Sequence, residues 1–245
     1  MNWLQRHWDA RAAANFMLGG AGSGLMTATL FIPDSPQFPV ILSLVLVAGG
    51  LTAVWLETGR KLRALNVLFN PFTSWMTRES FAALLLFPLG IGSLFVPSIL
   101  PLAAVAALAF LFCQARILRA AKGIPAWRAP QIVPLIVFTG LAEGAGLALF
   151  FSVDVLPVAF FALAVAARFV AWRRYRAAVP GKALERAGRA LVWIGTVAAL
   201  ALVFVPPLAG LAALAAGWWL KFALVTRASF NQGFSLPHLP VRGTR

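Results

Sequence analysis

The sequence predicts an all-α integral membrane protein, a bundle of eight transmembrane helices forming one domain over residues 1–245. The first observation is composition: 61% of the residues are hydrophobic and 11% are charged, whereas a soluble domain is about half apolar and a quarter charged. The second is the mean hydropathy of +0.85. A water-soluble core of this size could not bury so much apolar surface, so soluble enzyme folds are excluded.

The third observation is a series of eight apolar runs. A hydrocarbon core of about 30 Å needs roughly 20 apolar residues at about 1.5 Å each. The first run is too long for a signal peptide and turns straight back into a second, so we expect it to be a span. Prolines at Pro97, Pro101 and Pro206-Pro207 mark two tight joints where helices should stop. The predicted spans are residues 12–32, 39–56, 80–97, 99–116, 131–151, 155–172, 190–206 and 208–225.

The positions of the basic residues predict the orientation. The turns after the first, third, fifth and seventh spans contain no Lys or Arg, so all 21 basic residues are predicted on the other face. Arg168 and Lys221 are expected to reach that face from span ends by snorkelling. This positive-inside pattern predicts a bacterial inner-membrane protein with cytoplasmic termini and a cytoplasmic tail over 226–245. The same pattern accounts for the net charge of +14, so the expected partner is membrane lipid and not nucleic acid.

The side chains that bind metals and haem are scarce. Cys113 is the single cysteine and is predicted to be a small core residue, because one thiol cannot hold an iron–sulfur cluster or a zinc site. His7 and His238 lie near the termini and outside the spans, where they cannot ligate a membrane-embedded haem. We therefore expect no haem, iron–sulfur cluster or metal in this chain.

Two polar residues stand inside predicted spans. Glu143 lies near the middle of the fifth span, where a carboxylate needs a partner, a water-filled cavity or a proton. It is either a proton relay or ligand group, or an acid that bonds a neighbouring helix. Asn15, one turn inside the first span, could likewise bond a ligand carbonyl or another helix.

Glycines repeat at a spacing of four in two of the spans. Gly20 and Gly24 form one pair in the first span, and Gly140 and Gly144 form another in the fifth. Small residues at this spacing allow close helix packing. The echo between the two spans also suggests a parallel repeat of two four-helix halves.

The loop between the second and third spans has the richest chemistry. Glu57 ends one span and Glu79 starts the next, while Gly59 and Asn70-Pro71 interrupt the segment between them. Residues 62–69 suit a short amphipathic helix at the membrane interface. The loop is interpreted as the wall of an interfacial pocket, with a solvated basic loop as the alternative.

The same loop resembles a known family. Residues 57–79 read E-T-G-R-K-L-R-A-L-N-V-L-F-N-P-F-T-S-W-M-T-R-E. This is similar to the G-R-P-x-R…N-P-x-T-S-W-M-x-R-E segment of the NrfD/polysulfide reductase membrane-subunit family, a group that includes the dimethyl sulfoxide reductase anchors. The glycine-rich first span and the tail over 230–243 are also similar. The tail most resembles anchors of sulfite dehydrogenase and phenylacetyl-CoA:acceptor oxidoreductase complexes.

The resemblance implies a membrane anchor without a redox centre of its own. Such an anchor exchanges electrons between membrane quinone, either ubiquinone or menaquinone, and a four-cluster ferredoxin-like iron–sulfur subunit. A molybdopterin subunit then handles the substrate. Two positions depart from the family: Lys61 replaces a proline, and Glu57 stands where dimethyl sulfoxide reductase anchors have a histidine implicated in quinol binding.

We therefore expect a quinone pocket at the cytoplasmic ends of the first, second, third and fifth spans. Each quinone oxygen needs a hydrogen-bond partner, and one partner must exchange a proton. The residues predicted to be catalytic are Glu57 and Glu143. The residues predicted to bind quinone are Asn15, Glu57, Arg60, Arg78 and Glu79. The residues predicted to dock the iron–sulfur partner are Arg63, Trp75, His238 and Arg242.

Two rival functions remain open at this point. A proton-coupled secondary transporter would suit eight spans, a buried acid and glycine-rich helices. Against it, the spans offer few polar groups for a solute, and none is clearly broken midway. A scaffold that tethers the complex without binding quinone is the third possibility.

Overall fold

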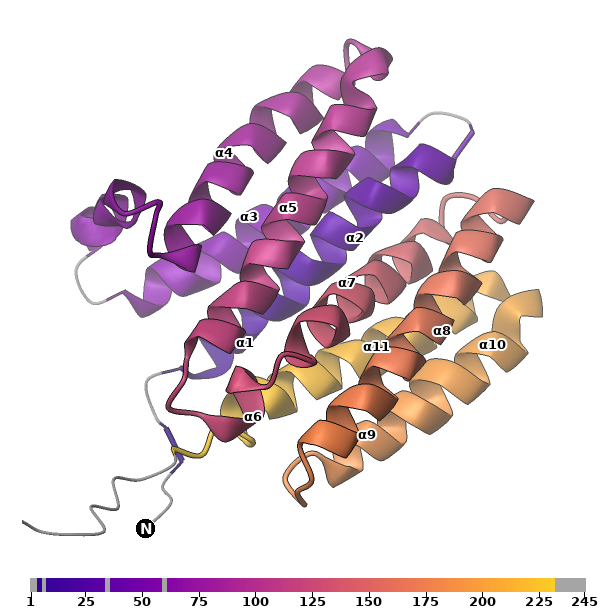
Figure 1. Ribbon diagram of the computed structural model, residues 1–245. Helices are drawn as coiled ribbons and strands as arrows, with labels where there is room; N and C mark the ends of the chain where they lie inside the picture. Colours follow the sequence, from indigo (N-terminus) through magenta and orange to yellow (C-terminus); the bar gives the residue numbers. More distant parts are fainter. Residues whose placement is uncertain (1–3, 6–7, 34–35, 59–60, 232–245) are drawn as a thin grey trace, which may run out of the picture.

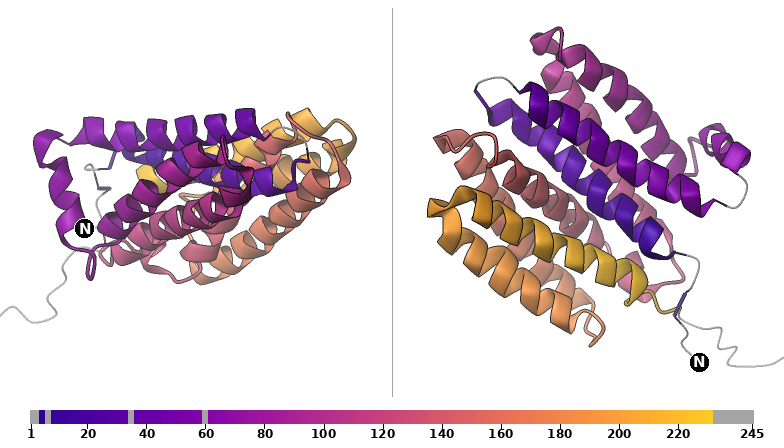
Figure 2. Two further views of the ribbon diagram at one scale, coloured as in Figure 1. Left: turned by 90° about the horizontal axis from the view of Figure 1, so that it is seen from above. Right: turned by 180° about the vertical axis from the view of Figure 1, so that it is seen from behind.

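The chain folds into one bundle of long helices that lie side by side (Figures 1 and 2). The computed structural model describes residues 4–5, 8–33, 36–58 and 61–231, with the backbone alone for 61–64 and 202. Within these residues it contains no strand beyond one isolated antiparallel bridge, between Leu4 and Phe230. The all-α class predicted from the sequence is confirmed.

The first half of the chain supplies four rods. The first rod winds without interruption through α1 (Ala10–Ala14), η1 (Asn15–Gly19), α2 (Gly20–Ala28) and η2 (Thr29–Phe31). The other elements of this half are α3 (Gln37–Glu57), η3 (Lys61–Phe69), α4 (Trp75–Ser93), η4 (Pro97–Ile99) and α5 (Leu100–Ala120). They lie together on one side of the bundle (Figure 1).

The second half forms the other side (Figure 1). Its elements are α6 (Pro125–Arg128), α7 (Ile132–Ala148), α8 (Val155–Ala178), α9 (Glu185–Val192), η5 (Trp193–Ala198), α10 (Ala199–Ala201), η6 (Leu202–Phe204) and α11 (Pro206–Thr226). The prolines predicted to mark joints lie at helix starts: Pro97 begins η4, and Pro206 begins α11.

Membrane-type helices are present in both halves. Among the described residues, four helical segments are long and apolar enough to cross a bilayer, with mean hydropathies of 1.7–2.2. They are Gln37–Glu57, Pro97–Ala120, Val155–Ala178 and Pro206–Thr226. The remaining predicted spans also overlap helical rods, but the count of eight spans and the side of the termini stay predictions.

The two halves meet through glycines. A Cβ at Gly24 would overlap the backbone of Gly140, and a Cβ at Gly144 would overlap the backbone of Gly24 and Leu25. The predicted packing role of these glycines is therefore confirmed: α2 and α7 approach backbone to backbone. Gly146 and Gly210 make a similar close contact between α7 and α11, which places α7 at the centre of the bundle.

Two rods contain π-helical turns, and both rods continue as helix through them. Asn15–Gly19 forms one such turn in the first rod, and Trp193–Ala198 forms the other in the seventh. A π turn widens the helix locally and occurs frequently at functional sites. The loop segment Lys61–Phe69 is a short helix, as expected, and its turns are of the 3₁₀ type.

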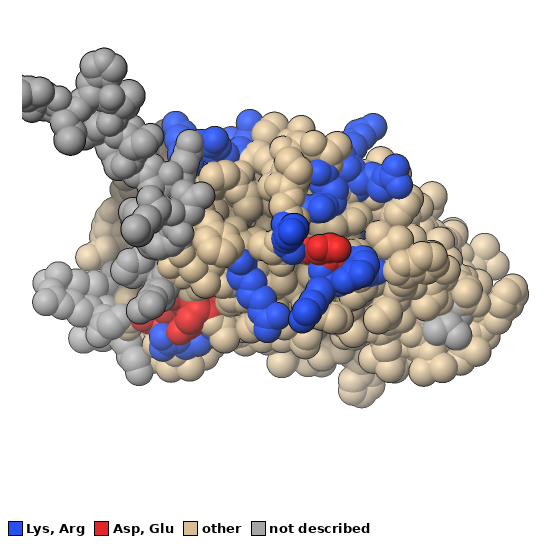
Figure 3. Space-filling view, turned by 90° about the horizontal axis from the view of Figure 1, so that it is seen from below, with Lys and Arg blue, Asp and Glu red and all other residues tan. Residues whose placement is uncertain are grey.

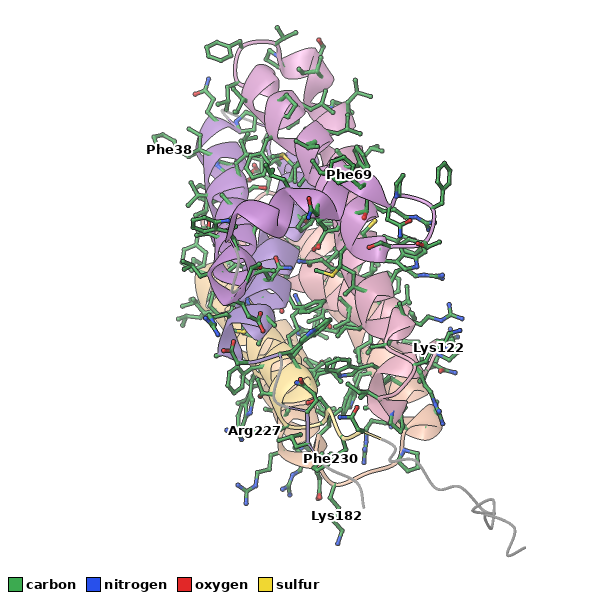
Figure 4. The ribbon with its side chains drawn as sticks, turned by 90° about the vertical axis from the view of Figure 1, so that its left-hand side faces the viewer. Phe38, Phe69, Lys122, Lys182, Arg227 and Phe230 are labelled. Atoms are coloured by element: carbon green, nitrogen blue, oxygen red, sulfur yellow. The ribbon has the colours of Figure 1, made fainter. Side chains whose placement is uncertain are left out.

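One end of the bundle carries the basic residues and is called the basic end below. Lys122, Lys182 and Arg227 lie toward this end, whereas Phe38 lies toward the other (Figure 4). On the face seen in Figure 3, Lys and Arg side chains far outnumber acidic ones. The described ends of the chain also meet there, because the Gln5 backbone N–H donates to the Ser229 carbonyl over 3.0 Å.

Candidate functional site: a polar cavity at the basic end

A cavity of about 250 Å³ opens at the basic end of the first half. Three of the five predicted quinone-binding residues, Asn15, Glu57 and Glu79, line it together. The other lining residues are Trp8, Phe16, Val54, Thr58, Met76 and Ile117. The cavity therefore combines two carboxyl groups and one amide with largely apolar walls.

Each polar residue of the cavity is positioned by a helix terminus or an irregular turn. Asn15 begins the π turn η1, and Glu57 is the last residue of α3. Glu79 lies in the second turn of α4, whose start is fixed by Ser74 as its N-cap: the Ser74 hydroxyl accepts a hydrogen bond from the Thr77 backbone N–H at 3.3 Å. Three segments distant in sequence thus supply the three polar groups.

A buried hydrogen-bond cluster forms the floor of the cavity. Asn15 Nδ2 donates to Glu79 Oε1 over 3.3 Å, and Gln114 Nε2 on α5 donates to the Asn15 carbonyl over 2.9 Å. The Gln114 side chain also reaches the Glu79 carboxylate. Within the described residues, Asn15 Oδ1 and Gln114 Oε1 are buried without a hydrogen-bond partner, and of these two residues Asn15 lines the cavity.

Glycines make room for this cluster. A Cβ at Gly50 of α3 would lie 3.0 Å from Asn15 Oδ1, and a Cβ at Gly19 would lie 2.5 Å from Gln114 Nε2. Larger residues at either position would displace an amide. The close approach of α3 and α5 to the first rod is therefore a condition for the polar cluster.

Arg11 is the described cation beside Glu57. It forms an ion pair with Asp9 at 2.8 Å, and its Nη1 donates to the Leu56 carbonyl over 3.2 Å. The hydrogen bonds from Arg11 hold the pKa of the Asp9 carboxyl below its ordinary value. Arg60 and Arg78 are the basic residues predicted for the site, and Arg11 was not predicted.

Arg78 does not line the cavity. Its Nε donates to the Pro71 carbonyl over 2.8 Å and its Nη2 to the Phe72 carbonyl over 2.6 Å, so it braces the loop before α4. Two guanidinium groups pack on the Trp75 ring, with centroid distances of 4.2 Å to Arg78 Cζ and 4.4 Å to Arg116 Cζ. Trp75 is half-buried in this stack.

Three other predicted site residues cannot be placed. Arg60, His238 and Arg242 lie outside the described residues, and Arg63 is described by its backbone alone. The predicted contribution of the fifth span is not found at the cavity: the fourth rod supplies Ile117 there, with Gln114 behind Asn15. An amide in a predicted span was a usable signal for Gln114, by the same argument that selected Asn15.

A second polar cluster lies deeper, in the other half of the bundle. Glu143 Oε2 and Lys221 Nζ form an ion pair at 2.6 Å, and both side chains are fully buried. Arg168 is also fully buried; its Nη1 donates to the Ala213 carbonyl over 2.8 Å, and its Nη2 donates to the Gly195 carbonyl. The prediction that Arg168 and Lys221 snorkel to the surface is wrong, because α8 and α11 continue well beyond them.

Glycines on neighbouring helices also leave space for the side chains of Lys221 and Glu143. Gly20 faces Lys221 Nζ, and a Cβ at Gly217 would overlap the Glu143 carboxylate. Glu143 Oε1 and Arg168 Nε are buried without a partner in the described part of the chain. No member of this cluster lines the cavity, so the structure separates Glu143 from Glu57, the other residue predicted to be catalytic.

The comparisons with known proteins give no family assignment. No protein-family model matches the sequence, and no curated protein matches it.

Proposed function

We propose that the chain is the membrane anchor subunit of a molybdopterin/iron–sulfur oxidoreductase and exchanges electrons with membrane quinone at the cavity. The observation that carries the proposal is the convergence of Asn15, Glu57 and Glu79 on one cavity. The sequence alone predicts all three as quinone-binding residues. The family resemblance of residues 57–79 supports the same assignment.

The proposed topology has eight spans in a bacterial inner membrane, with both termini in the cytoplasm. It is supported by the overlap of every predicted span with a helical rod and by the basic end (Figure 4). The contact between Gln5 and Ser229 is consistent with an even number of spans, because it keeps the two described chain ends on one side.

The cavity fits the head of a quinone. Its volume of about 250 Å³ is slightly below the roughly 300–1,000 Å³ of drug-sized pockets, which suits one ring with the isoprenoid tail outside. Trp8, Phe16 and Ile117 offer apolar surface for the ring. Asn15 Oδ1 is a buried acceptor without a partner among the described residues, and it can accept a hydrogen bond from a quinol hydroxyl.

Glu57 and Glu79 have different roles in proton transfer because they differ in solvent exposure. A bound quinone supplies two-electron, two-proton chemistry. Glu57 is partly exposed at the end of α3 and can pass protons between the cavity and the cytoplasm. Glu79 is 5% exposed and holds or releases a proton inside, while the amides of Asn15 and Gln114 orient its carboxyl group. The apolar walls exclude bulk water from this exchange.

Carboxyl-to-amide variants test the site. Glu57→Gln and Glu79→Gln keep the side-chain shape and remove the exchangeable proton. We expect each to reduce the affinity of the purified protein for a fluorescent hydroxyquinoline N-oxide, a quinol analogue, by about tenfold or more. Asp154→Asn is the matched control, because Asp154 precedes α8 at the end far from the cavity (Figure 1). Unchanged binding in both Glu variants would refute the quinone site.

Purification from the native host tests the partners. An anchor should bring with it a subunit containing iron and another containing molybdenum or tungsten. Purification of the chain alone would contradict the proposed complex. Co-purification without any binding of the quinol analogue would instead support the scaffold function.

The buried cluster of Glu143, Lys221 and Arg168 favours the alternative of a proton-coupled transporter, because intramembrane charges commonly mark ion pathways. In that case the purified chain in liposomes should show solute uptake driven by a proton gradient. Glu143→Gln should abolish this uptake and leave binding of the quinol analogue unchanged in protein that circular dichroism shows to be folded, because the change also removes the partner of Lys221.

A further inference from the structure

A separate pocket lies between α8 and α9 at the basic end. Its volume is about 220 Å³. The residues that line it are Trp172, Arg176, Glu185, Gly188, Arg189, Val192 and Trp193. None of them lines the quinone cavity, so the pocket needs its own explanation.

The inner wall of the pocket is well defined. Trp172 is 5% exposed, and its ring lies against Gly188, where a Cβ would come within 2.7 Å of Trp172 Cη2. Arg176 is anchored beside it: its Nη1 donates to the Gly181 carbonyl over 2.7 Å and to the Val179 carbonyl over 3.3 Å. Because both bonds use Nη1, the N–H groups on Nε and Nη2 can serve a ligand.

The outer wall continues into an apolar surface. Trp193 is 64% exposed, and Ile194 and Val197 on the same π turn are 46% and 48% exposed. They follow α9 along the rod, away from its basic end, whereas Arg189 is exposed one turn before Trp193. This is the order in which a membrane protein meets phosphate, interface and acyl chains: cationic groups, then Trp, then aliphatic side chains.

We propose that this pocket binds an anionic phospholipid whose headgroup carries hydroxyl groups, of the phosphatidylglycerol class. Arg176 and Arg189 hold the phosphodiester, because guanidinium groups donate paired hydrogen bonds to phosphate oxygens. Glu185 accepts hydrogen bonds from the headgroup hydroxyls. Trp193 and Val197 contact the first acyl-chain carbons.

The charges of the pocket match this ligand. Two arginines and one glutamate give the lining a net charge of +1. The phosphodiester group of phosphatidylglycerol carries a single negative charge. Basic pockets between transmembrane helices on the cytoplasmic side are places where anionic headgroups bind. The proposal depends on membrane insertion of α8 and does not depend on quinone chemistry.

Lipid titration of the full chain tests the proposal. The protein is purified in detergent, and native mass spectrometry measures its affinities for phosphatidylglycerol and for phosphatidylethanolamine with the same acyl chains. We expect phosphatidylglycerol to bind more tightly. Arg189→Gln should weaken its binding about tenfold, because a hydrogen bond to a charged group is lost, and Arg189→Lys should restore part of it.

Two further variants and one competitor make the result specific. Arg227→Gln removes an exposed arginine that lies at the same end but not in this pocket and should leave affinity unchanged. Glu185→Ala removes the acceptor and should weaken phosphatidylglycerol relative to phosphatidic acid, which has no headgroup hydroxyl. Inorganic phosphate at millimolar concentration should not displace the lipid.

Three outcomes would overturn the proposal. Equal affinity for the two phospholipids would remove the headgroup selectivity, and equal effects of the Arg189 and Arg227 changes would remove the site. Efficient displacement by inorganic phosphate would identify a free-phosphate site instead. Circular dichroism of each variant confirms that the helices are intact, so a loss of binding cannot be attributed to unfolding.

Discussion

The buried ion pair between Glu143 and Lys221 should show strong energetic coupling. We expect Glu143→Gln and Lys221→Met each to destabilise the fold, and the double variant to be more stable than either single one. The reason is that each single change leaves a buried charge without its partner, whereas the double change removes both charges. Arg168 is buried in the same cluster, so the two single variants should differ in how much stability they lose.

The magnitude follows from the geometry. At the observed 2.6 Å and an effective dielectric constant of about 20, the attraction is about 6 kcal/mol. Desolvation of the two ions offsets several kcal/mol, so loss of one partner costs about 3–5 kcal/mol. Glu143→Gln leaves two buried cations and should cost about 5 kcal/mol, whereas Lys221→Met leaves Glu143 with Arg168 and should cost about 3 kcal/mol. The double variant should cost about 2 kcal/mol, the price of one poorly bonded amide.

The assay is a titration with sodium dodecyl sulfate in mixed micelles, followed by helical circular dichroism. The free energy of unfolding of the four proteins gives the coupling energy of the pair. Lys122→Met is the matched control, because Lys122 is exposed at the basic end (Figure 4) and its loss should change stability by less than about 0.5 kcal/mol. Additive single effects, or a Glu143→Gln variant as stable as the control, would show that the pair does not stabilise the bundle.

Two further predictions address packing and pH. Gly144→Ala should destabilise the fold by about 1–3 kcal/mol, because its Cβ would overlap the backbone of α2. Gly181→Ala is the control and should be near neutral, because no heavy atom lies within 4 Å of its Cβ position. Thermal unfolding compares the two variants, and equal melting temperatures would contradict the close crossing of α2 and α7. For pH, Arg11 lowers the pKa of Asp9 in the folded state, so the stability from this pair is present above the unfolded pKa of about 3.9 and is lost as the pH falls through the folded value. Melting temperatures of the native protein and Asp9→Asn should therefore differ at pH 6 and converge toward pH 3, and a difference that persists at acid pH would disprove the link.

Much of the candidate site could be anticipated from local sequence signals. Glu57 and Glu79 were identifiable because acids at the ends of apolar runs mark the membrane boundary, and Asn15 because an amide inside a span needs a partner. The structure brings these three residues around one cavity. Asn70-Pro71 also ended a helical segment as predicted, since η3 stops at Phe69.

Other contacts could not be anticipated from spacing. Arg78 was assigned to the pocket from its position in the loop, yet it bonds the carbonyls of Pro71 and Phe72. Gln114 lies 99 residues from Asn15, whose carbonyl it bonds. Such pairs depend on which faces of two helices meet, and hydropathy is nearly uniform around these helices.

The sequence by itself determined that the chain is a helical membrane-type protein with its basic residues concentrated at one end. Hydropathy and charge are sums over neighbouring residues, so they can be evaluated without knowing the fold. The tertiary structure alone decided that Lys221 is paired with Glu143 at the interior, and that Asn15, Glu57 and Glu79 share a cavity. Close glycine contacts fix the rotation and depth of each helix, and that rotation determines which polar groups meet.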